Sequence, residues 1–196
     1  MQDKLTHDEQ QILLRLAREA MILRVKGGKL PRLDLSSLPE RLREDGASFI
    51  TLTIRGELRG CIGALEPHQP LAEDVREHAA AAALEDPRFA PVSEGELSTI
   101  QIEVSRLTRP VQLEYADADD LISKLKPHVD GVILHDVFHH ATFLPQVWEK
   151  IPDPVEFLNQ LCWKMGMSEN AWRAKHLEVF TYQAEDFHES PNNQAA

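Results

Sequence analysis

The chain lacks the features that mark several common functional classes. Its 196 residues include only two cysteines, Cys61 and Cys162, and no Cys-x-x-Cys pair, which excludes a zinc site built on paired thiolates and argues against a disulfide framework. No apolar run is long enough to span a bilayer, and the start of the chain lacks the basic and then apolar segments of a signal peptide. We therefore expect a cytoplasmic protein in a reducing compartment.

Positive charge and glycine-rich loops are also scarce. The chain has 32 acidic and 21 basic residues, a formal net charge of −11, and no Lys/Arg-rich run offsets it. Nucleic-acid binding depends on neutralising phosphates, so no DNA or RNA partner is expected. Phosphate-binding loops with Walker or Rossmann spacing and a Gly-x-Ser-x-Gly elbow are missing as well. The sequence identifies no cofactor.

The most informative segment that is present is residues 58–63, Leu-Arg-Gly-Cys-Ile-Gly. In an extended strand residues i and i+2 share a face, so Arg59 and Cys61 are expected on the same side. A guanidinium beside a thiol favours the thiolate. The flanking Gly60 and Gly63 would let a small ligand or another backbone approach the sulfur. This pattern predicts a reactive cysteine.

A second interpretation makes Cys61 a core residue. Residues 49–55 are rich in β-forming side chains, and Gly56-Glu57 indicates a two-residue hairpin turn into the Cys61 strand. On that register Leu52 lies opposite Cys61 and gives the thiol an aliphatic neighbour. A free cysteine in such a strand is often a small apolar side chain. Cys162, on an apolar helix stripe, is interpreted as core.

Four blocks of the sequence occur in an order and spacing that resemble the AMMECR family. They are Leu-Arg-Gly-Cys-Ile-Gly at 58–63, Asp-Pro-Arg-Phe at 86–89, Glu-Val-Ser at 103–105 and Phe-Leu-Pro-Gln-Val-Trp at 143–148. The resemblance covers nearly the whole chain and is strongest to stand-alone bacterial members of the AmmeMemoRadiSam system. It implies an α+β domain around a mostly antiparallel sheet, with a cleft near the cysteine motif. It also implies, as partners, a Memo-type protein and a radical S-adenosylmethionine enzyme.

The patterns along the chain predict the same fold class. After a capping box at Thr6 and Glu9, apolar residues recur at helical spacing from Ile12 to Leu23, and Gly27-Gly28 ends the run. Residues 99–107 alternate apolar and polar side chains as a strand does. We expect a single α+β domain over 6–188, with a mainly antiparallel sheet, helices packed on it and room for a small second lobe. The tail 189–196 lacks apolar residues and is expected to be disordered.

The candidate site residues are the reactive groups of the family blocks and one histidine. The expected catalytic residues are Cys61 as nucleophile and Glu103 or His128 as proton carrier; the expected substrate-binding residues are Arg59, Gly60, Gly63, Asp86 and Arg88. Two plainer interpretations stay open. Asp86 and Arg88 can be a turn-stabilising pair, and Glu103 can be a solvated strand residue.

A cluster of histidines occupies residues 128–140. If Val137-Phe138 forms a tight turn, Asp136 pairs with His139 and His135 with His140, close enough to bind a transition metal. The family pattern carries glycine or arginine around these positions, and no standard metal-ligand spacing is present. We therefore expect a solvated hairpin tip and assign no metal site.

Two hypotheses about function follow. In the first, the chain is a cysteine-dependent enzyme, or a component of one, that acts on a small substrate in a cleft around Cys61. In the second, the same cleft holds a ligand or a segment of a Memo-type or radical S-adenosylmethionine partner without catalysis. Exposure and reactivity of the Cys61 thiol distinguish them.

Overall fold

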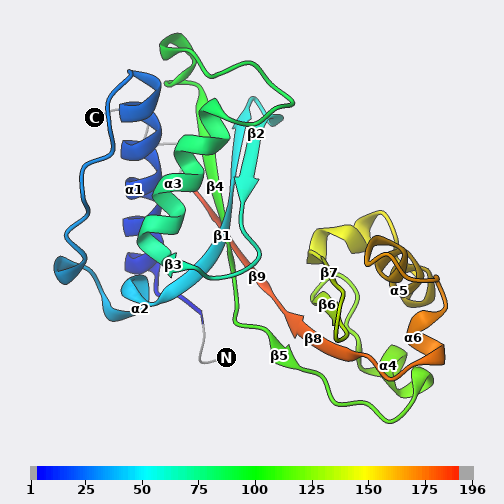
Figure 1. Ribbon diagram of the computed structural model, residues 1–196. Coiled ribbons are helices and arrows are strands. Elements are labelled where there is room, and N and C mark those ends of the chain that lie inside the picture. Colours follow the sequence, from blue (N-terminus) through cyan, green and yellow to red (C-terminus); the bar gives the residue numbers. More distant parts are fainter. Residues whose placement is uncertain (1–3, 190–196) are drawn as a thin grey trace. The chain divides into compact units, whose positions relative to one another are not determined.

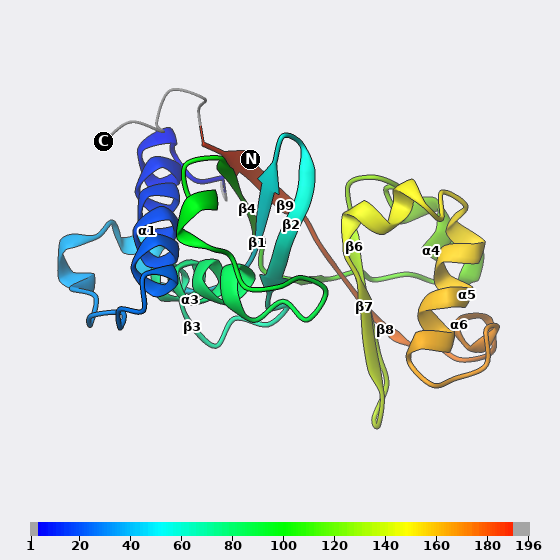
Figure 2. The same ribbon diagram turned by 90° about the horizontal axis from the view of Figure 1, so that it is seen from above.

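The computed structural model describes residues 4–189 and divides into two compact units (Figures 1 and 2). The first unit comprises Met1–Leu107 with Glu185–Ala196, and the second is Thr108–Ala184. Each unit has its own sheet and its own cluster of buried apolar side chains. The strands pair antiparallel in both sheets, so the predicted α+β fold is confirmed.

The first unit is built on a sheet with the strand order β2-β1-β4-β9. Its strands are β1 (Asp45–Ile54), β2 (Glu57–Gly63), β4 (Ile100–Leu107) and β9 (Ala184–His188), with the short β3 (Gln69–Pro70) pairing with β1. Because β1 lies between β2 and β4, side chains from separate family blocks are brought into register across it.

Two helices, α1 (His7–Val25) and α3 (Leu71–Leu84), cover one face of this sheet (Figures 1 and 2). The predicted capping box at the start of α1 is present: Thr6 accepts a hydrogen bond from the Glu9 backbone, and the Glu9 side chain accepts one from Thr6 N. The helices pack on inward-facing strand residues such as Ile50 and Leu52, which are fully buried. Shorter helical turns are η1 (Leu35–Ser37), α2 (Glu40–Arg43) and η2 (Glu94–Glu96).

The end of α3 lies unusually close to β2. A β-carbon added to Gly60 would lie 2.2 Å from the carbonyl oxygen of Ala82, a distance that real side chains do not show. Only glycine at position 60 permits this approach of the α3 backbone. The segment that follows α3, with the Asp-Pro-Arg-Phe block, thereby lies against the Cys61 strand.

The second unit contains a four-stranded sheet in the order β5-β8-β6-β7 and three helices. Its elements are β5 (Val111–Gln112), α4 (Ala118–Lys124), β6 (Gly131–His135), β7 (His140–Phe143), η3 (Pro145–Glu149), α5 (Pro154–Lys164), α6 (Ala171–Ala174) and β8 (Glu178–Tyr182). The fourth family block lies here and has a packing role. Trp148 is fully buried, stacks on Phe157 at a centroid distance of 3.7 Å, and donates a hydrogen bond to the carbonyl of Asp130.

The expected disordered tail, 189–196, needs correction at its first residue. Glu189 is buried, pairs with Arg18 of α1, and accepts a hydrogen bond from Ile102 N. A carboxylate with these partners is held in place, so Glu189 belongs to the folded unit. Residues 190–196 lie outside the described range.

None of the helices between residues 4 and 189 has the length and apolar character needed to cross a membrane.

We predict that Gly60→Ala destabilises the first unit by about 1–3 kcal/mol, because the added methyl group must displace the Ala82 backbone. Gly95→Ala is the matched control, since a β-carbon there meets no atom within 4 Å. Urea unfolding should be followed by far-UV circular dichroism, because Trp148, Trp163 and Trp172 all lie in the second unit and report on it. Equal unfolding midpoints for the two variants would contradict the close approach.

Candidate functional site

The hairpin that carries Cys61 turns one residue earlier than expected. Ile54 pairs with Glu57, so the two turn residues are Arg55 and Gly56, with φ angles of 55° and 84°. Two consecutive positive φ angles are the signature of a type I′ turn, whose twist matches that of the flanking strands. The predicted Gly56-Glu57 turn is therefore wrong: glycine occupies the second turn position, and Arg55 adopts a left-handed conformation.

A β-bulge then changes which residue faces Cys61. The pairing of β2 with β1 skips Arg59, so that Gly60 pairs with Leu52 and Cys61 with Thr51. The predicted pairing of Cys61 with Leu52 is wrong. The earlier turn moves the partner of Cys61 by two residues, which keeps the face, and the bulge moves it back by one, which changes the face. Arg59 is the bulged residue, so the rule that residues i and i+2 share a face no longer applies to Arg59 and Cys61.

Three side chains from neighbouring strands form a row on the sheet face away from α1 and α3. Thr51 pairs with Cys61 on one side and with Glu103 on the other. Its neighbours Ile50 and Leu52 point into the core under the helices, so Thr51 and its partners point the opposite way. We call Cys61, Thr51 and Glu103 the outer row. Two strand spacings of about 4.8 Å put the backbones of Cys61 and Glu103 roughly 10 Å apart.

The Cys61 thiol is half-buried and lies among polar groups. The Thr51 hydroxyl donates to the sulfur at 3.4 Å, and Arg88 donates to the Cys61 carbonyl at 3.2 Å. Cys162 is completely buried on α5, as expected for a core residue, and burial raises the pKa of its thiol. The two cysteines therefore have different surroundings, and Cys61 is the one with access to reagents.

Asp86 joins the segment after α3 to the backbone of Cys61. Its carboxylate accepts hydrogen bonds from Cys61 N at 2.8 Å, from Arg88 N at 3.1 Å, and from the Arg88 guanidinium at 2.7 and 2.9 Å. Its bond to the backbone N–H two residues later forms an Asx turn, which is typical of aspartate before proline in a turn. We call Asp86, Arg88 and the Cys61 peptide the aspartate latch.

The aspartate latch is strongly charge-stabilised. Asp86 is 5% exposed, and its hydrogen bond from Arg88 lowers the pKa of the carboxyl far below its ordinary value, against the opposing effect of burial. The same bond raises the pKa of the Arg88 guanidinium, and the Cys61 side chain adds to that rise. Arg88 is therefore a permanent cation beside the thiol, held by a permanent anion.

Arg59 does not take the position beside the thiol that the strand pattern predicted. Its guanidinium bonds to the Glu96 carboxylate at 2.7 and 3.3 Å and to the carbonyls of Ala90 and Pro91 at 2.9 and 3.4 Å. The bond from Arg59, with two from Ser93, lowers the pKa of Glu96 to about 2. Arg59 thus fastens the loop before β4 to β2, and the cation near Cys61 is Arg88.

The two motif glycines serve close packing. Gly60 allows the approach of α3, and a β-carbon on Gly63 would lie 2.3 Å from the Ser48 carbonyl oxygen and 2.5 Å from the Phe49 ring. These contacts account for both glycines within the folded chain. The substrate-binding role predicted for Arg59, Gly60 and Gly63 thus gains no support from their contacts.

Glu103 is exposed at the other end of the outer row. Desolvation by its surroundings raises the pKa of its carboxyl, the Asp186 carboxylate raises it further, and His188 opposes the rise. Both neighbours come from β9, the strand next to β4. A carboxyl with a raised pKa exchanges protons closer to neutral pH, which suits a proton carrier.

His128 belongs to the second unit, whereas the outer row belongs to the first. It lies in the turn before β6 and has a left-handed backbone, with φ of 65°. Within the first unit, Glu103 is therefore the remaining candidate among the two predicted proton carriers.

The histidine-rich hairpin forms as predicted. Its tight turn is Val137-Phe138, His135 pairs with His140, and His139 contacts Asp136 at 3.2 Å. His135 instead directs its ring nitrogen to Glu178 of β8, at 2.6 Å. Among residues 4–189, no group of three or more histidine, cysteine or acidic side chains is placed to bind a metal ion.

Several residues around the site were missed. Thr51 could not be identified because its partner depends on the bulge. Glu96 had a visible signal, since Ser93 and Glu96 form the Ser-x-x-Glu capping box that the structure shows at η2. Asp186 and His188 carry no motif and are placed only by the pairing of β9 with β4.

Comparison with known proteins identifies the family. The AMMECR1 family model matches residues 14–187. The chain belongs to the AMMECR1 family. A protein of Thermofilum pendens is 38% identical and one of Methanothermobacter thermautotrophicus is 38% identical, the alignments covering 95% and 94% of this chain and 92% and 96% of the relatives. The crystal structure of uncharacterized protein PH0010 from Pyrococcus horikoshii superposes with a TM-score of 0.77 at 33% identity, covering 95% of this chain and 94% of that one.

We predict that Asp86→Asn destabilises the first unit by about 1.5–3 kcal/mol at pH 7, because it removes the charge that binds Arg88 and Cys61 N. The wild-type contribution is fully present above the ordinary carboxyl pKa near pH 4 and is lost as pH falls through the depressed pKa of Asp86. Hydrogen exchange at the β2 amides measures the first effect at pH 7, and the same measurement from pH 5 down toward pH 2 follows the second. Asp120→Asn, which breaks the exposed pair with Lys124 in the second unit, should cost less than about 1 kcal/mol at the α4 amides.

We further predict that Glu103 titrates above the ordinary glutamate range in a carbon-detected NMR titration. Replacing Asp186 with Asn should lower the pKa of Glu103, because a repelling carboxylate is removed. Replacing His188 with Gln should raise it, because an attracting imidazolium is removed. Shifts of the same sign in both variants would rule out this arrangement of charges.

Proposed function

We propose that this AMMECR1-family protein is a cysteine-dependent enzyme, or a component of one, that acts on a small substrate over the outer row. Cys61 is the nucleophile, Arg88 stabilises its thiolate or an anionic group of the substrate, and Glu103 carries the proton. The observation that carries the proposal is the position of the Arg88 guanidinium, which Asp86 fastens directly at the Cys61 peptide.

The convergence of the family blocks supports a site at this place. The 58–63, 86–89 and 103–105 blocks lie far apart in sequence, yet Cys61 bonds to Asp86 and shares a strand partner with Glu103. A motif that served packing alone would not need a half-buried thiol next to a fixed cation. The glycines and Arg59 then supply the rigid frame, and Cys61, Arg88 and Glu103 supply the chemistry.

The spacing of the outer row limits the mechanism. With roughly 10 Å between their backbones, Glu103 is not placed to take the proton from Cys61 in a direct hydrogen bond. In the proposed mechanism Glu103 acts instead on a substrate that lies across Thr51, with one end at the sulfur and the other at the carboxyl. The Thr51 hydroxyl, which bonds to the sulfur, orients the thiol between them.

A second candidate is a non-catalytic ligand-binding or partner protein, for which a Memo-type or radical S-adenosylmethionine protein is the proposed partner. The observation in its favour is that both motif arginines are already paired, Arg59 with Glu96 and Arg88 with Asp86. Arginines in such ion pairs stabilise the conformation of a binding surface and need take no part in a reaction.

Alkylation of native protein by iodoacetamide tests the enzyme proposal. We predict that Cys61 reacts in the folded state and that Cys61→Ser abolishes this reaction, while Cys162 reacts only after unfolding. Arg88→Gln should slow alkylation at pH 7 by roughly three-fold or more, because the cation beside the sulfur is removed. Mass spectrometry of the modified peptides separates the two cysteines.

Arg59→Gln is the matched control, since it removes an equal charge whose partner is Glu96. It should leave the alkylation rate of Cys61 close to that of the wild type. If Cys61 reacts only on unfolding, or if the two arginine variants behave alike, the enzyme proposal fails. Association with Memo-type or radical S-adenosylmethionine proteins that survives Cys61→Ser would then favour the binding role.

A further inference from the structure

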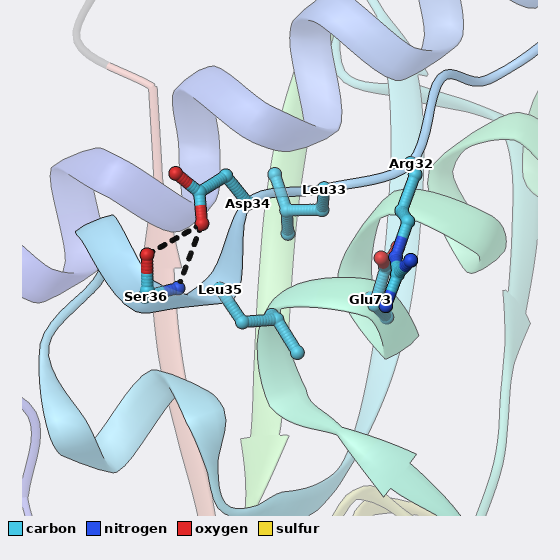
Figure 3. A pocket seen from close by; sticks show the side chains of 6 residues that line it. All are labelled: Arg32, Leu33, Asp34, Leu35, Ser36 and Glu73. Carbon is cyan, nitrogen blue, oxygen red and sulfur yellow. Dashed lines mark hydrogen bonds between the residues drawn. The ribbon is translucent and has the colours of Figure 1, made fainter.

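A pocket of about 460 Å³ lies in the first unit, lined by the segment around η1 and the first turn of α3 (Figure 3). Its lining residues are Arg32, Leu33, Asp34, Leu35, Ser36 and Glu73. Its volume is within the range of small-molecule sites. None of these residues belongs to the outer row or to the aspartate latch, so the pocket is a separate feature of the fold.

The walls of the pocket are fixed by hydrogen bonds. The Asp34 carboxylate accepts from Ser36 N at 3.1 Å and from Ser36 Oγ at 2.6 Å, which closes the η1 turn. At the other end, the Arg76 guanidinium donates to the Pro31 carbonyl at 2.8 Å and to Glu73 at 2.7 Å, and so ties the segment to α3. A segment held at both ends presents a preformed site, which lowers the entropy cost of binding.

The pocket combines an apolar floor with charged groups. Leu33 and Leu35 are half-buried and pack on the core cluster of the first unit, so one side of each remains open. Arg32 is exposed, and within the described residues it forms no ion pair. In Figure 3 the Arg32 side chain extends toward Glu73, whereas Asp34 and Ser36 lie on the opposite side of the two leucines.

The available charges at one end of the pocket are of both signs. The Arg32 guanidinium offers paired donors that fit a carboxylate. Arg76 bonds to Oε2 of Glu73, which leaves Oε1 for a further donor. Asp34, by contrast, is already bonded to Ser36, and these bonds lower the pKa of its carboxyl. A ligand that satisfies this end carries a carboxylate and an ammonium group close together.

We propose that this pocket binds a free α-amino acid with an apolar side chain. Its carboxylate pairs with Arg32, its ammonium group with Glu73, and its side chain covers Leu33 and Leu35. The site is independent of Cys61, because it shares no residue with the outer row or the aspartate latch, and it has the character of a ligand or effector site.

The test uses L-leucine with the full chain, by isothermal titration calorimetry and by amide chemical shifts of residues 32–36. We expect saturable binding by L-leucine, and binding about ten-fold weaker or more for 4-methylpentanoate, which lacks the ammonium group, and for 3-methylbutylamine, which lacks the carboxylate. Equal binding of 4-methylpentanoate and L-leucine, or no saturation by L-leucine, would overturn the proposal.

Variants connect the binding to the named residues. Arg32→Gln should weaken L-leucine binding about ten-fold or more and leave the fold intact, because Arg32 is exposed. Glu73→Gln should restore part of the relative affinity of 4-methylpentanoate, and Arg43→Gln, at an exposed arginine outside the pocket, should change nothing. Binding unchanged in Arg32→Gln would contradict the proposal. Cys61→Ser should bind L-leucine normally, which separates this result from the outcome at the thiol.

Discussion

The arrangement of the first unit around Cys61 depends on one buried carboxylate. Asp86 has lost nearly all contact with water, and a buried charge is tolerated only when it is paired and hydrogen-bonded. Its partners come from its own turn and from β2, namely the guanidinium and backbone of Arg88 and the N–H of Cys61. The carboxylate therefore requires that the end of α3, the following turn and the Cys61 strand stay together.

The motif residues therefore fall into two groups: those that position the backbone and those that present reactive side chains. Gly60, Gly63, Arg59 and Asp86 determine where backbones lie, because they permit close approach or fasten loops. The second group is the outer row, whose side chains lie on the sheet face away from α1 and α3. A substitution at Asp86 should therefore act on Cys61 through its position, and loss of function there would not identify Asp86 as a group that touches a substrate.

The sequence predicted the fold class well because its signals were local. The capping box at Thr6, the alternation over β4 and the turn at Val137-Phe138 each involve residues within a few positions of one another. The face of Cys61 was not predictable, because the bulge at Arg59 decides it and has no strong sequence signal. The ion pair of Arg59 with Glu96 was not predictable either, because it depends on how the loop before β4 folds against β2.

The chain leaves the first unit after β4 and returns to it at β9, with the whole second unit between them. The returning segment supplies Glu185, which binds Leu5 N, and Glu189, which pairs with Arg18. During synthesis the contiguous second unit can complete its contacts as soon as it has emerged from the ribosome. The first unit must wait for β9 and Glu189, although most of it is made before the second unit. Its α1–β4 part therefore passes through translation with a sheet edge uncovered, which exposes it to mispairing with other chains.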